Sequence, residues 1–105
     1  MEEFKRRVMK SGTNYGITIP TDVVKRLNLK QGDYVFVEIL LDDVPVFRGT
    51  KKVTVVGKML TIILPKRTIY TKIWNILHRK GIDLVVRVQP VRDIRSKLGS
   101  FAQEL

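Results

Sequence analysis

The sequence contains no cysteine and only one histidine, His78, among its 105 residues. The lack of cysteine excludes disulfides and thiolate zinc sites, and a lone histidine excludes most other zinc sites and argues against the usual catalytic triads. No Gly-Lys-Ser/Thr element follows Gly12 or Gly16, so there is no Walker loop. We therefore predict a protein that is not an enzyme, with no catalytic residues, no metal and no cofactor.

Long apolar runs are also missing. No stretch approaches the roughly 18 apolar residues of a transmembrane helix. The first residues, Met1-Glu2-Glu3-Phe4-Lys5, lack the apolar centre of a signal peptide. The expectation is a soluble cytoplasmic protein without membrane association.

Acidic residues are scarce beside basic ones. Ten Asp and Glu face twenty Lys and Arg, which gives a net charge of +10. Residues 1–49 carry eight basic and seven acidic side chains (+1), and residues 50–105 carry twelve and three (+9). An excess of this size attracts polyanions such as nucleic acids, although a solvated basic surface would show the same composition.

The apolar pattern predicts a mainly β domain with short helices. Alternating and β-branched runs, with Gly, Pro and Asp-Asp as punctuation, predict strands at 4–10, 15–19, 34–41, 44–47, 52–56, 59–64 and 84–88. A short helix is expected after Pro20, and a longer one ends at Lys80 before Gly81. Asp42-Asp43 is expected as a hairpin turn, which makes paired acid–base carboxylates improbable.

The longer helix has one apolar arc and one polar arc. Its apolar arc, expected to cover the barrel, consists of Ile69, Tyr70, Ile73, Trp74, Ile76 and Leu77. Trp74 is expected in the core. His78 falls on the polar arc and is expected to be solvated.

The order of these elements repeats along the chain. Gly12 precedes Pro20 by eight residues, and Gly57 precedes Pro65 by the same interval. A shift of 45 residues superimposes the first of these segments on the second. Farther along, a shift of 50 residues superimposes Leu27, Asp33 and Val35 on Leu77, Asp83 and Val85. We therefore predict two β-β-α-β halves, 1–49 and 50–90, in one domain spanning 1–90.

Residues 91–105 form a separate tail, expected to be helical. Five apolar residues have the 3, 4, 3, 4 spacing of a helical seam: Val91, Ile94, Leu98, Phe101 and Leu105. Gly99 weakens such a helix. Two interpretations stand side by side: a helix docked on its own domain, and a seam for a protein partner.

The segment from Val8 to Val35 contains four short motifs: the turn Lys10-Ser11-Gly12-Thr13-Asn14, then Ile17-Thr18-Ile19-Pro20, Leu27-Asn28-Leu29 and Gly32-Asp33. With these motifs at this spacing, the segment resembles the AbrB/MazE/SpoVT family of DNA-binding proteins. The resemblance covers about residues 5–40 well and 51–88 by pattern only. It implies a swapped-hairpin, double-psi-like β-barrel built from two β-β-α-β halves. Relatives usually build the barrel from two chains, so a homodimer and a single-chain pseudo-dimer both stay open.

The resemblance also implies that the first strands present basic and polar side chains to the DNA major groove. The matching positions are Lys10, Ser11, Thr13 and Thr18, with Arg6 or Arg7 nearby. Asn14 can bond adenine, and it is equally explained as a turn residue that tolerates left-handed geometry.

The second half departs from this pattern. Val55, Val56 and Ile63 stand where the first half has Lys10, Ser11 and Thr18. Contacts from this half would come instead from Lys51, Lys52, Lys58, Lys66 and Arg67. Cations oppose the dipole in the first turn of a helix. Either the helix after Lys66-Arg67 starts later with Thr68 as its N-cap, or the pair meets phosphate.

The leading functional hypothesis is a sequence-specific double-stranded DNA-binding transcription regulator. The alternative is an antitoxin that binds operator DNA and, through its tail, a toxin. The tail is not the acidic arm expected of an antitoxin, since Arg92, Arg95 and Lys97 outnumber Asp93 and Glu104. RNA binding is disfavoured because no strand shows paired aromatic residues for base stacking.

Overall fold

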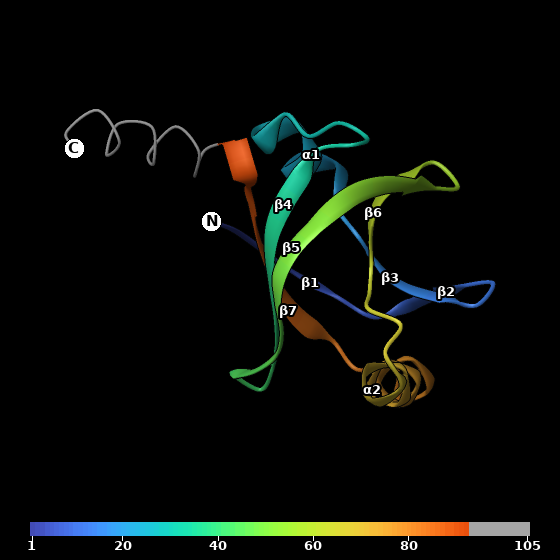
Figure 1. Ribbon diagram of the computed structural model, residues 1–105. Helices are drawn as coiled ribbons and strands as arrows, with labels where there is room; N and C mark the ends of the chain where they lie inside the picture. The colour runs from blue at the N-terminus through green and yellow to red at the C-terminus, as the bar shows by residue number, and fades with distance from the viewer. Residues whose placement is uncertain (93–105) are drawn as a thin grey trace, which may run out of the picture.

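The computed structural model describes residues 1–92 of the chain, which form a mainly β structure with two short helices (Figure 1). The predicted fold class is confirmed. The strands are β1 Glu2–Arg6, β2 Met9–Ser11, β3 Asn14–Thr18, β4 Tyr34–Leu41, β5 Val44–Val56, β6 Met59–Ile63 and β7 Leu84–Pro90. The helices are α1 Thr21–Leu27 and α2 Thr68–Lys80. The predicted seam residues from Ile94 onward lie outside the described residues.

All seven strands form one antiparallel sheet in the order β1-β7-β4-β5-β6-β3-β2. The sheet curls into a half-barrel because the long strand β5 pairs with β4 along its first part and with β6 along its second (Figure 1). Its two edges, β1 and β2, are consecutive in the chain. Arg6 connects the edge strand β1 to β3, since its Nε donates a hydrogen bond to the carbonyl of Thr18 over 3.2 Å.

Two predicted strand boundaries are corrected. The run 4–10 is divided into β1 and β2, because Val8 turns into the core at 3% exposure where the chain leaves β7 and joins β3. Conversely, 44–47 and 52–56 are parts of the single strand β5, since Gly49 and Thr50 stay paired with β4. The expected limit between residues 49 and 50 therefore falls inside an unbroken strand.

The hairpins β2–β3 and β5–β6 have the same internal register. Met9 faces Gly16 in the first hairpin, and Thr54 faces Thr61 in the second. Each residue of the second pair lies 45 positions after its counterpart. Both turns also contain a glycine with a positive φ angle.

Glycine is needed at both turns, because Gly12 and Gly57 adopt left-handed φ angles of 58° and 61°. The hairpins meet where β3 pairs with β6, and there Ile17 pairs with Ile62, its counterpart at a shift of 45. An approximate two-fold relation therefore passes through this isoleucine pair.

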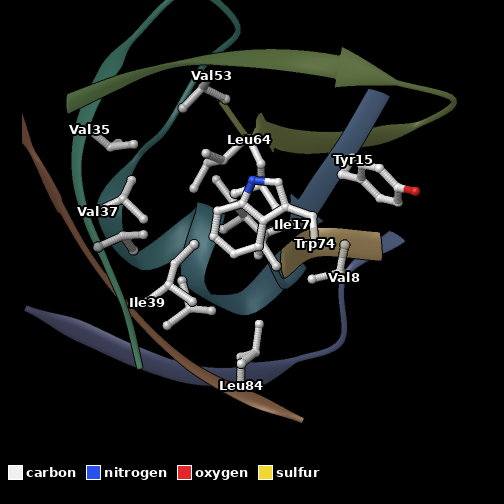
Figure 2. Close-up of a cluster of buried hydrophobic side chains, with 14 of the residues drawn as sticks. Val8, Tyr15, Ile17, Val35, Val37, Ile39, Val53, Leu64, Trp74 and Leu84 are labelled. Atoms are coloured by element: carbon white, nitrogen blue, oxygen red, sulfur yellow. The ribbon is translucent and has the colours of Figure 1, made fainter. Parts of the chain in front are cut away.

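The core fills the concave side of the sheet around Trp74 (Figure 2). The helices α1 and α2 lie at opposite ends of the curled sheet (Figure 1). The side chain of Trp74 is fully buried, stacks on Tyr70 and donates from Nε1 to the carbonyl of Pro65 over 3.2 Å. The core expectation for Trp74 is confirmed, and this bond satisfies its only polar atom.

The apolar arc of α2 is only partly used. Leu77 is buried with Trp74, whereas Ile69 and Ile76 are 68% and 43% exposed. The helix crosses one end of the half-barrel, so only the middle of its arc meets the core.

The expectation for His78 was wrong. Its Nδ1 lies 2.9 Å from the carbonyl oxygen of Val8, and its ring packs edge-on against Tyr15. A nitrogen facing a carbonyl must carry the proton. His78 therefore attaches α2 to the β1–β2 connection instead of standing in solvent.

Candidate nucleic-acid interface

Arginines and lysines differ in whether they form ion pairs within the protein. Among residues 1–92, ion pairs are formed by Arg7, Arg26, Arg48, Arg87 and Arg92, and by no lysine. Four of the five candidate lysines, Lys10, Lys52, Lys58 and Lys66, are exposed, and Lys51 is half-buried. Their charges are available to an external anion.

A row of paired acidic and basic side chains crosses the wall formed by β1, β7, β4 and β5. Glu3 pairs with Arg87 over 2.8 Å, Arg87 with Glu38 over 3.0 Å, and Glu38 with Arg48 over 2.5 Å. These residues are direct cross-strand neighbours, so the row runs straight across four strands. We call it the ion row.

Glu38 is the central residue of the ion row and is only 8% exposed. The hydrogen bond from Arg48 holds the pKa of Glu38 below its ordinary value, against the opposing effect of burial, and Arg87 adds to the lowering. The sequence reasoning missed this row. The predicted Asp42-Asp43 hairpin could have suggested the Glu38–Arg48 pair, but nothing in the sequence places Arg87 beside them.

The first hairpin does not bring all its candidate residues to one face. Ser11 pairs with Asn14 in the β2–β3 ladder, and side chains alternate along a strand, so Ser11, Asn14 and Thr18 share the outer face. Lys10 pairs with Tyr15 and lies on the opposite face, with its Nζ 5.7 Å from the centre of the Tyr15 ring.

The surroundings of Lys10 and Thr13 fix the end of this hairpin. Tyr15 is buried and donates from its hydroxyl to Oδ1 of Asn75 in α2 over 3.0 Å. The ring under Lys10 is thus held in place, and a cation over such a ring is stabilised. Thr13 is exposed at the turn. The ammonium group and the hydroxyl therefore stand at the projecting end of a rigid hairpin.

Asn14 is not the left-handed residue of the turn. The positive φ falls on Gly12, and Asn14 lies in regular β3. The turn explanation for this asparagine was therefore wrong. Its Oδ1 is buried and has no hydrogen-bond partner within the part of the chain that the structure describes. A polar atom left in this state costs stability, which sets Asn14 apart from its neighbours.

Two of the three candidate arginines, Arg6 and Arg7, are engaged within the protein. Arg6 is half-buried and bonds the carbonyl of Thr18, as described above. Arg7 is exposed and pairs with Asp83 over 3.1 Å, with both side chains more than 60% exposed. Arg6 therefore connects β1 to β3, whereas Arg7 stays at the surface.

The second hairpin places its candidate residues at a different location. Lys58 is exposed at the turn, but Val55 is 42% exposed and Val56 and Ile63 are half-buried. Lys51 and Lys52 line a surface cavity of about 440 Å³. Its remaining lining residues are Gln31, Gly32, Val53, Thr54 and Ile63. We call this cavity the lysine corner.

Lys66 and Arg67 lie directly before α2. The helix begins at Thr68, and Arg67 is its N-cap residue without a side-chain capping bond, so the proposal of Thr68 as N-cap was wrong. The amide of Leu64 donates to the carbonyl of Tyr15 over 2.9 Å. This bond extends the β3–β6 pairing by one residue beyond β6.

Within residues 1–92, no cluster of three His, Asp or Glu side chains could hold a metal ion. None of the helices in the same residues is long and apolar enough to cross a membrane.

Comparison with known proteins identifies one segment. Residues 8–43 match the family model described as "Antidote-toxin recognition MazE, bacterial antitoxin". No curated protein and no solved structure matches the chain. The matched segment contains β2, β3, α1 and β4, and the match supports a regulator of the antitoxin or DNA-binding kind. Over residues 8–43 the chain is therefore AbrB/MazE-like, as the resemblance in its sequence implied.

Proposed function

We propose that this protein is a cytoplasmic, sequence-specific double-stranded DNA-binding transcription regulator that acts by occupying its site. The observation that carries the proposal is the contrast between the balanced ion row and the unpaired lysines of the hairpins. Lysines without acidic partners release the counterions of DNA phosphates when they bind, which provides affinity for any duplex. We assign this binding to a domain of residues 1–90.

Specific recognition requires donors and acceptors at base edges. The outer face of the first hairpin offers the hydroxyls of Ser11 and Thr18 and the amide of Asn14. An asparagine amide matches the two major-groove groups of adenine. Rotation of Asn14 toward a base would also give its unpartnered Oδ1 a hydrogen bond. Lys10 and Thr13 stand at the end of the hairpin, beside these residues.

A library of duplexes with a randomised centre, selected at two salt concentrations, tests the proposal. We expect enrichment of one sequence and a binding constant that falls steeply with salt. Binding without enrichment would show a nonspecific DNA-binding protein, and no binding would refute the proposal.

Two substitutions divide the roles of the lysines. Lys10→Ala should weaken binding to the selected sequence more than to random DNA. Lys52→Ala should weaken both alike and reduce the salt slope by about one. Lys5→Ala is the matched control, because Lys5 is exposed and unpaired but lies on the ion-row wall. Equal effects of Lys10→Ala and Lys52→Ala would refute the division of roles.

An antitoxin is the second candidate function, and the printed description of the matched family favours it. In this case the tail would hold the toxin through Val91, Ile94, Leu98, Phe101 and Leu105. Co-expression with the product of a neighbouring gene tests it, with Leu98→Asp and Phe101→Asp as variants. A complex that both changes disrupt, with DNA binding retained, would establish the antitoxin function.

A further inference from the structure

We infer that a single chain recognises a non-palindromic duplex site, with the first hairpin reading bases and the lysine corner holding a backbone phosphate. This inference rests on the proposed DNA binding and adds the symmetry of the target and the role of each hairpin. It starts from the approximate two-fold relation between a first unit, β1 to β4 with α1, and a second unit, β5 to β7 with α2.

The relation extends beyond the hairpins to the pairing of β4 with β7. Val37 faces Val88 and Glu38 faces Arg87. Positions 87 and 88 lie 50 residues after positions 37 and 38. Replacing each residue by its counterpart at this shift therefore turns the pair 37/88 into the pair 87/38, and the reverse. The two units therefore pair with each other as two copies of one unit would in a symmetric dimer.

The ion row distinguishes this pairing from that of two identical units. Its acids, Glu3 and Glu38, lie on β1 and β4, whereas Arg48 and Arg87 lie on β5 and β7. If two first units paired in the same register, Glu38 would face Val37 of the other copy. A nearly buried carboxylate would then lack its cation, which is strongly unfavourable. The row thus selects pairing of unlike units, as occurs within one chain.

The outer faces of the two hairpins differ in chemistry. Residues Ser11, Asn14 and Thr18 of the first hairpin correspond to Val56, Met59 and Ile63 of the second. The first set can hydrogen-bond to base edges, and the second cannot. A symmetric protein favours a palindromic site, and these unlike faces remove that symmetry.

The two equivalent corners differ as well. In one, Arg7 is paired with Asp83. Their counterparts are Lys52, which lines the lysine corner, and Asp33, which follows the lining residue Gly32; within residues 1–92 these two side chains form no ion pair with each other. Asp33 instead accepts hydrogen bonds from Arg92 over 3.2 Å and from the amide of Lys30 over 2.9 Å.

Lys51 and Lys52, which form no ion pair within residues 1–92, are thus both among the residues that line an open cavity of about 440 Å³. No acidic residue lines this cavity. A backbone phosphate of the duplex is negatively charged and complements the positive charge of this corner, since lysine binds phosphate as a point charge. The second unit thus grips the backbone while the first reads the sequence.

The test measures the symmetry of the selected DNA site and the number of chains bound to it. The duplex library described above yields the site, and sedimentation of the protein with that duplex yields the stoichiometry. A non-palindromic site bound by one chain supports the inference. A palindromic site bound by two chains would overturn it while leaving DNA binding intact. Absence of any selected site would instead refute the proposed function.

The role of the lysine corner has its own readout. Lys51→Ala combined with Lys52→Ala should reduce the salt slope by about two and lower affinity equally for selected and random duplexes. Circular dichroism verifies folding, and Lys5→Ala is again the control. A loss confined to the selected duplex, or an unchanged salt slope, would contradict a phosphate contact at this corner.

Discussion

The two hairpins of this protein pair their strands in the same register but differ in the side chains at their surfaces. Both have the same internal register, both turn at a left-handed glycine, and they meet through one isoleucine pair. Yet three outer-face positions are Ser11, Asn14 and Thr18 in the first hairpin, and their counterparts in the second are Val56, Met59 and Ile63. The comparison teaches that inward-facing residues and turn glycines maintain the scaffold, while outward-facing residues are free to give each hairpin a separate role.

The largest expected effects concern the shared scaffold. Ile17→Ala and Ile62→Ala should each lower the free energy of unfolding by about 2–5 kcal/mol, because both side chains are fully buried. Urea denaturation measures both values, and similar losses are expected from equivalent positions. A large loss at one position and almost none at the other would show that the two hairpins are not equivalent in packing.

The next effect separates the outer faces. Asn14→Ala should cost about 1–3 kcal/mol of affinity for the selected duplex and little for random DNA. Its counterpart, Met59→Ala, should leave the preference unchanged. Titration of both variants with both duplexes measures the difference. If Met59→Ala alters the sequence preference as strongly as Asn14→Ala, the assignment of reading to the first hairpin is wrong.

The ion row predicts how the pairing of the two units responds to pH. The pKa of Glu38 is lowered mainly by its hydrogen bond from Arg48. A carboxyl whose pKa is lower in the folded chain than in the unfolded chain stabilises the folded state. This stabilisation is complete above the pKa of the unfolded chain, about 4.3, and is lost as the pH falls through the pKa of the folded chain. Stability should therefore decline on acidification below about pH 4.3.

Thermal unfolding across this pH range measures the decline. Glu38→Gln should make the protein less stable at neutral pH and flatten the acid dependence. The carboxyl of Asp22, whose pKa is lowered mainly by its hydrogen bond from Arg26, remains in this variant and accounts for residual dependence. An unchanged pH profile in the variant would show that the ion row does not stabilise the paired units.

The smallest expected effect concerns the ion pair between Arg7 and Asp83. Asp83→Asn releases Arg7 from an exposed ion pair, which should change stability by less than about 1 kcal/mol. The freed guanidinium should steepen the salt slope of DNA binding by about one. A slope equal to that of the unaltered protein would place Arg7 away from the duplex.

Much of the local structure was predictable from the sequence. The strand Tyr34–Leu41, the turn at Asp42-Asp43 and the end of α2 at Lys80 agree with the pattern analysis. These features depend on alternation, turn residues and a stop signal within a few positions of each other. The division between β1 and β2 was missed, because it depends on the strand changing its partner from β7 to β3.

The sequence predicted which residues belong to the candidate site better than it predicted where their side chains lie. The five proposed lysines form no ion pair within residues 1–92, but neither do the lysines that were not proposed, such as Lys5, and Lys10 lies on the other face from Ser11. The pairing of Arg7 with Asp83 joins positions far apart in the chain and has no local signal. The contact between His78 and the carbonyl of Val8 was missed for the same reason.

The sequence by itself determined the β-rich class, the repeated order of elements, the excess of positive charge and the turn glycines, since each depends on neighbouring residues or on composition. Only the tertiary structure decided which cations are neutralised, which side chains share a face and how the two units pair. Those outcomes depend on strand register and on contacts between distant positions, and no local pattern encodes them.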